Sequence, residues 1–159
     1  MALALLGLVI GVLADLAREY SHLIAFARAK DNTAVAVAAL ERMGRDSEQS
    51  LSILEPAVGG SGDVLSLEVI DTDSPLRIQN LAGWEPDRAS DRLQIRYELR
   101  ERDLARVQTG ATTTEMVMAS EIEGFAVSYP DTRQVRIELS IRERQRVATF
   151  VTLAFRWVE

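Results

Sequence analysis

The stretch ALALLGLVIGVLA, Ala2 to Ala14, opens the chain with thirteen uncharged residues. No proline and no strong turn signal follows it before Pro56. A long stretch without proline or glycine clusters favours helix, because those residues are the usual signals that end one. We therefore expect one long N-terminal helix from Ala2 to about Leu54, apolar at its start and amphipathic after that.

The second half of this helix carries a stripe of apolar residues at the three- and four-residue spacing of one helix face. We expect this stripe to cover a sheet through Leu40, Met43, Leu51 and Leu54. The segment Asp31-Asn32-Thr33 contains three poor helix formers, which together sacrifice roughly 1–2 kcal/mol of helix propensity. We expect a continuous helix with a soft middle there, and a full break is the alternative.

The apolar start of the helix is a candidate assembly surface. Its residues are Leu3, Leu6, Gly7, Ile10, Gly11 and Leu13. Gly7 and Gly11 form a G-x-x-x-G motif, which lets two helices approach closely; the other interpretation is two glycines that only loosen the helix. The run is shorter than the roughly 20 residues that span a bilayer. Either this end packs into a protein partner, or it is part of a longer apolar segment that begins upstream.

After Pro56 the apolar residues alternate with polar ones, which predicts strands. The segment PAVGGSG, residues 56–62, is expected to end the helix. Strands are expected at Val64 to Ile70, Leu93 to Arg100, Leu104 to Gln108, Phe125 to Tyr129, Val135 to Ile141 and Val147 to Trp157. The opposite face of these strands is polar, which predicts an antiparallel sheet that is covered on one face only. We expect the helix stripe to contact residues such as Ile95, Ile137 and Leu153. In the last strand the residues expected to share the face of Leu153 are Val147, Thr149, Val151, Phe155 and Trp157.

The expected fold class is therefore α+β, with a long N-terminal helix packed on an antiparallel β-sheet. Residues 1–55 form the helix in this interpretation, and residues 56–159 form the head. Residues 71–92 form a long variable loop rich in Asp, Pro and Gly, of the kind that is usually functional or mobile. Trp84 in this loop is a candidate contact residue; the alternative is a tryptophan folded back onto the sheet edge.

The composition excludes several kinds of chemistry. A net charge of -6 argues against nucleic-acid binding, which needs clustered Lys and Arg. The absence of cysteine excludes disulfides and thiolate metal sites. The only histidine, His22, lies in the expected helix, so the head has no imidazole base for a nucleophile. Glu68, Asp71 and Asp73 lack the spacing of a calcium loop. We expect no catalytic residue, no metal and no cofactor, and so a protein that is not an enzyme.

The order of four local phrases is similar to that of a known family. The phrases are ALALLGLVIGVL, AALERMGRDSEQSL, LQIRYELRERDLARV, and SEIEGFAVSY followed by TFVTLAF. In this order they resemble minor subunits of the type IV pilin superfamily, in particular the J-type minor pseudopilins of type II secretion. Family members begin with an aromatic residue and a nearby glutamate, whereas the first glutamate here is Glu19. Processing and N-methylation are therefore assigned to no residue.

The resemblance implies a non-enzymatic subunit of a type II secretion system or of a type IV pilus-like fibre. Its expected partners are other minor pilin or pseudopilin subunits in a heteromeric tip complex. It also implies a single-pass protein of the bacterial inner membrane, held by the N-terminal helix, with the head in the periplasm. From the residues alone, a soluble β-rich binding domain with an N-terminal dimerising helix is the alternative.

Overall fold

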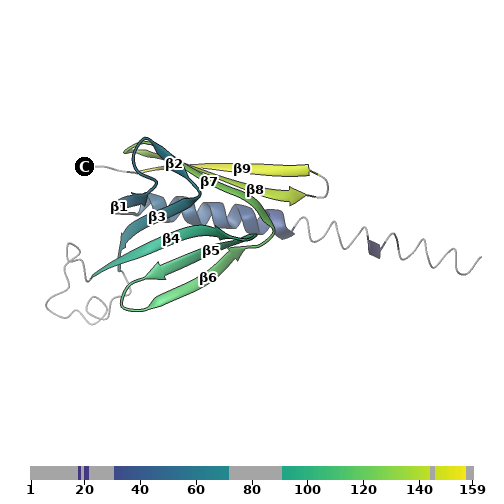
Figure 1. Cartoon of the computed structure of the whole chain (residues 1–159), viewed down its shortest axis with the longest axis horizontal. Helices are drawn as coiled ribbons and strands as arrows, with labels where there is room; N and C mark the ends of the chain where they lie inside the picture. Colours follow the sequence, from purple (N-terminus) through teal and green to yellow (C-terminus); the bar gives the residue numbers. More distant parts are fainter. Residues whose placement is uncertain (1–17, 19, 22–30, 72–90, 144–145, 157–159) are drawn as a thin grey trace, which may run out of the picture.

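The computed structural model describes residues 18, 20–21, 31–71, 91–143 and 146–156. Within these ranges the strands form two antiparallel sheets (Figure 1). The five-stranded sheet has the order β1-β3-β4-β5-β6, and the four-stranded sheet has the order β2-β7-β8-β9. The first sheet contains β1 (Ser52–Glu55), β3 (Val64–Ile70), β4 (Arg92–Arg100), β5 (Asp103–Thr109) and β6 (Thr113–Ala119). The second contains β2 (Gly60–Gly62), β7 (Ile122–Asp131), β8 (Gln134–Glu143) and β9 (Arg146–Phe155).

The expected α+β fold, a long helix packed on one antiparallel sheet, is wrong. Strands make up 62% of the described residues, and they form two sheets beside a single short helix. That helix is described over residues 31–48, and residues 18, 20 and 21 are also helical. Alternation identifies strands but not their partners, so it did not reveal that the strands after β6 leave the first sheet and build a second one. The segment Asp31-Asn32-Thr33 is helical.

The short helix ends at residue 48, and the chain then enters β1 instead of continuing to Leu54. Two serine hydroxyls cap its last turn: Ser47 Oγ donates to the Met43 carbonyl at 2.8 Å, and Ser50 Oγ donates to the Ser47 carbonyl at 2.7 Å. Next, the Leu51 N–H donates to the Glu68 carbonyl on β3 at 2.7 Å. This long-range bond joins the chain to the five-stranded sheet, so residues 56–62 lead from β1 into β2 and do not end a helix.

The short helix lies between the two sheets and contacts the inner face of each (Figure 1). Its buried side, with Ala36, Ala39, Leu40 and Met43, belongs to the same core as Leu65, Leu67, Ile95, Leu104, Val135, Ile137 and Leu139 from the sheets. Leu51 and Leu54, by contrast, are 40% and 47% exposed. The expectation that these two leucines extend the packed stripe is therefore wrong, because the helix has ended before them.

Several expectations lie outside the described residues. These are the assembly surface at Leu3, Leu6, Gly7, Ile10, Gly11 and Leu13, the loop residue Trp84, and residues 72–90 of the variable loop. For the part of the chain that the structure covers, we find no helix with the length and apolar character needed to cross a bilayer.

Candidate functional site

A buried polar cluster joins the short helix to the five-stranded sheet. It consists of Asp46 on the last turn of the helix, Tyr97 on β4 and Arg106 on β5. Tyr97 and Arg106 are direct cross-strand partners, so both side chains point to the same face of the sheet. That face is the inner one, because Tyr97 is fully buried against the helix. Strand register therefore brings a phenol and a guanidinium to one carboxylate.

The three side chains of the cluster satisfy one another. Tyr97 Oη donates to Asp46 Oδ2 at 2.7 Å, and Arg106 Nε donates to Tyr97 Oη at 3.1 Å. Arg106 Nη2 lies 3.1 Å from Asp46 Oδ2 in an ion pair whose side chains are only 10% and 6% exposed. Arg42, one helical turn before Asp46, reaches Asp46 Oδ1 with Nε at 3.1 Å. Two guanidinium groups thus neutralise one buried carboxylate, as a charge in this position requires.

The electrostatics of the cluster keep Tyr97 in its neutral form. Burial, followed by the negative charge of Asp46 and the hydrogen bond to it, raises the pKa of the Tyr97 hydroxyl well above its ordinary value. Arg106 opposes this rise and lowers the pKa, but less strongly. A neutral hydroxyl that donates to a carboxylate is suited to joining two elements and not to taking a proton from a substrate.

A cleft of about 370 Å³ opens beside this cluster. It is lined by Arg42, Asp46, Gln49, Val69, Ile70, Leu93, Ile95, Arg106 and Gln108. Its size falls in the range of small-molecule pockets. Both arginines at its wall are already paired with Asp46, and Arg106 Nη1 also donates to Gln108 Oε1 at 3.0 Å. The polar groups left for a ligand are therefore chiefly the amide of Gln49 and the NH₂ group of Gln108.

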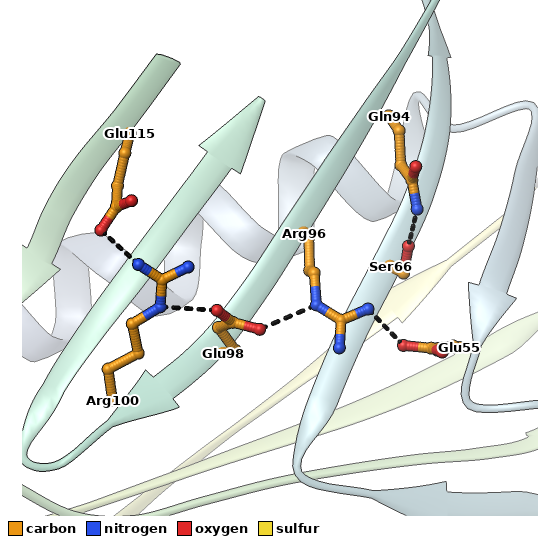
Figure 2. A network of polar contacts seen from close by, with 7 residues as sticks. All are labelled: Glu55, Ser66, Gln94, Arg96, Glu98, Arg100 and Glu115. Atoms are coloured by element: carbon orange, nitrogen blue, oxygen red, sulfur yellow. Dashed lines mark hydrogen bonds and ion pairs between the residues drawn. The ribbon is translucent and has the colours of Figure 1, made fainter. Parts of the chain in front are cut away.

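The outer face of the five-stranded sheet carries a charge ladder, Glu55–Arg96–Glu98–Arg100–Glu115 (Figure 2). The successive nitrogen–oxygen distances are 2.8, 2.8, 2.6 and 2.7 Å. Hydrogen bonds from Arg96 and then Arg100 lower the pKa of Glu98. Since the three glutamates and two arginines alternate and leave a net charge of only -1, the ladder offers little attraction for a charged partner.

The outer face of β9 is different, because apolar side chains point to solvent there. We call this set the β9 row: Val147, Val151, Leu153 and Phe155, which are 58%, 49%, 46% and 57% exposed. The alternate residues of β9 face inward, and Ala154 is fully buried in the core. The helix passes close to this inner side at Thr152: a Cβ added to Gly44 would lie 3.8 Å from Thr152 Oγ1.

The sequence patterns predicted neither the buried polar cluster nor the exposed β9 row. It treated the odd-numbered residues of β9 as the buried face, whereas the structure points them outward. The cluster had one visible signal, since Asp46 follows Met43 by three residues and so falls on the apolar stripe of the helix. Leu40 and Met43, which the sequence predicted to pack on the sheet, are buried in the core and are not exposed at the surface.

The comparisons with known proteins give no family. No family model, no curated protein and no solved structure matches the chain. Among the residues that the structure describes, no group of three or more acidic or histidine side chains is placed to hold a metal ion. The β9 row is therefore the feature on which we base a functional proposal.

Proposed function

We propose that the protein is a non-enzymatic assembly subunit: a minor pseudopilin of a type II secretion system, or a minor pilin at the tip of a type IV pilus-like fibre. The observation that carries the proposal is the β9 row, in which four large apolar side chains of one strand point to solvent. Contiguous exposed apolar surface commonly marks a site of protein–protein contact. The proposal assigns no chemical step to any residue.

The kind of assembly is inferred from the sequence. The apolar segment Ala2 to Ala14, the phrase AALERMGRDSEQSL and the closing phrase TFVTLAF occur in the order that resembles minor pseudopilins. In this proposal the apolar segment holds the chain in the bacterial inner membrane and contacts neighbouring helices, and the head lies in the periplasm. The β9 row then contacts another minor subunit of a heteromeric tip complex.

The test is co-purification of the native full-length chain from membranes, with Val151→Lys as the variant. The matched control is Val117→Lys on β6, because Val117 is exposed to almost the same extent, 53% against 49%, on a strand of the other sheet. We expect Val151→Lys to lose the pilin-like partners and Val117→Lys to keep them. Circular dichroism of both variants checks that each is folded. The absence of pilin-like partners from the unmodified sample would refute the proposed function.

One observation favours the alternative, a soluble β-rich binding domain with an N-terminal dimerising helix. It is the cleft of about 370 Å³ beside the buried cluster. A small-molecule screen by thermal denaturation tests this function, with Gln49→Trp as the variant that fills the cleft. The alternative predicts a ligand that raises the melting temperature of the unmodified protein and has no effect on the variant.

A further inference from the structure

The strand β9 is one of the two edges of the four-stranded sheet, and β2 is the other. Within the described residues β9 pairs with β8 alone, over ten residues from Arg146 to Phe155 (Figure 1). The pairing has no register shift, so the strand is regular from end to end. One side of β9 therefore presents a long row of backbone N–H and C=O groups to whatever lies beside the sheet.

After Arg146 at its start, this edge lacks the features by which proteins usually protect an edge strand. Such features are charged residues, proline, a bulge or a very short strand. Residues 147–155 read VATFVTLAF and contain no charged residue and no proline. In addition, the strand has the full length of β8 and no bulge. An edge of this kind is prone to accept another strand, and here its exposed apolar row lies along the same strand.

We propose that β9 binds an extended segment of a partner protein, which adds as a further strand to the β2-β7-β8-β9 sheet. Backbone hydrogen bonds would supply the affinity, and contacts with the β9 row would favour apolar, β-branched side chains on the partner strand. The inference deepens the proposed function and rests on it for the existence of a protein partner.

Charge at the two ends of β9 sets the chemistry of the partner. Arg146 begins the strand, and Arg156 follows it directly. The guanidinium of Arg156 donates to neutral oxygens, those of Tyr129 Oη and of the Ser50 and Leu51 carbonyls, so these contacts do not neutralise its charge. Glu143 lies directly opposite Arg146 on β8, but residues 142–146 contain three arginines and only this one glutamate, so both ends of this edge are locally positive. A partner segment with carboxylates at both ends is complementary to them.

The middle of the partner strand is expected to be uncharged. A hollow of about 230 Å³ separates the short helix from β9 and is lined by Glu41, Gly44, Arg45, Glu48, Thr152 and Leu153. The hollow leaves room beside the strand for side chains of a partner. Its two glutamates would repel a central carboxylate, so the acidic residues belong at the ends of the segment.

A second copy of this chain is the less suitable partner. Antiparallel pairing of two β9 strands about Val151 would place Arg146 of each copy opposite Arg156 of the other. Like charges directly opposite each other destabilise a strand pair.

The test uses the full chain and two peptides. The acidic probe is Glu-Glu-Thr-Val-Thr-Val-Thr-Val-Thr-Glu-Glu, and its control has Lys in place of every Glu. We expect the acidic peptide to slow hydrogen exchange of β9 amides, and to bind about tenfold more tightly than the Lys peptide at low salt. Arg146→Glu should remove this preference, whereas Arg100→Glu, at a half-exposed site on the outer face of the five-stranded sheet, should retain it.

Three results would overturn the inference. The first is no change in β9 exchange with the acidic peptide, and the second is equal affinity for both peptides. The third is a dimer in sedimentation without peptide whose β9 amides are protected, because a second copy would then occupy the edge. If the peptide binds as expected and native membranes yield no pilin-like partner, only the proposed function fails. If partners depend on Val151 and β9 exchange never changes, only this inference fails.

Discussion

Replacing Tyr97 by Phe tests whether the buried cluster holds the short helix to the five-stranded sheet. The substitution keeps the buried ring and removes the hydroxyl. Two hydrogen bonds to charged groups are lost: the 2.7 Å bond to Asp46 Oδ2 and the 3.1 Å bond from Arg106 Nε. Because these bonds involve charged partners and a buried site, we expect a net loss of roughly 1.5–3 kcal/mol in the free energy of unfolding.

The remaining contacts set the upper limit of this loss. Asp46 keeps the ion pair with Arg106 at 3.1 Å and the contact with Arg42 at 3.1 Å, so no charge is left unpaired. Tyr97→Phe therefore remains below the roughly 3–5 kcal/mol that follows when one partner of a buried ion pair is removed. Asp46→Asn, which takes the charge away from Arg106, should reach that larger range.

The assay is urea unfolding followed by far-ultraviolet circular dichroism, with the melting temperature as a second measurement. For a chain of this size each kcal/mol shifts the melting temperature by about 2–4 °C, so a shift of about 3–12 °C is expected for Tyr97→Phe. The matched control is Tyr20→Phe, because Tyr20 is 68% exposed and its hydroxyl has little to lose. If both variants unfold at the urea concentration of the unmodified protein, the cluster contributes nothing and the reasoning is refuted.

Two further predictions follow from the core. The pKa of Tyr97 is raised by burial and then by Asp46, so the folded state keeps the proton above the ordinary value of about 10. Stability from this group is complete below about pH 10 and is lost as the pH rises above it; alkaline titration by circular dichroism should show a steeper loss in the unmodified protein than in Tyr97→Phe. Met43→Ala, at a fully buried site, should lower the free energy of unfolding by roughly 2–5 kcal/mol. Leu51→Ala, at a site that is 40% exposed, should cost much less, and urea midpoints of the two variants compare them.

The strands were predictable because alternation is a local property. The segments Val64 to Ile70 and Leu93 to Arg100 became β3 and β4 with nearly the expected bounds. The strand β2 was not predictable in this way, because Gly60–Gly62 has no apolar side chain to alternate. The division into two sheets depends on which strands pair, and the spacing of residues along one strand carries no information about that.

The end of the helix shows a second limit of local patterns. Leu51 and Leu54 continue the spacing of Leu40 and Met43, so periodicity alone extends the helix through them. What ends it is the Leu51 N–H bond to the carbonyl of Glu68, which lies on a strand that the pattern cannot place beside the helix. Local patterns could not predict the buried cluster either, because Tyr97 and Arg106 lie 51 and 60 residues from Asp46 along the chain.

The strand β9 was recognised as a strand, and the direction of its faces was inferred wrongly. Alternation divides its residues into two sets but does not say which set meets the core, and one set must then point away. The usual rule assigns the larger apolar set to the inside. Here the inside is occupied by Ala148, Phe150, Thr152 and Ala154, because β8 pairs them with its own buried face, Val135 to Ile141.

The outward direction of the large apolar side chains of β9 bears on function. The strand β9 turns only Phe150 among its large apolar side chains inward and leaves Val147, Val151, Leu153 and Phe155 about half exposed. This arrangement loses hydrophobic burial, since full burial of a Val, Leu or Phe side chain contributes roughly 1.5–3 kcal/mol. Sequence rules are expected to fail where function requires the exception. A partner that covers Val151, Leu153 and Phe155 would recover that burial on binding. The residues whose positions the pattern misjudged are therefore the ones that the proposed assembly contact uses.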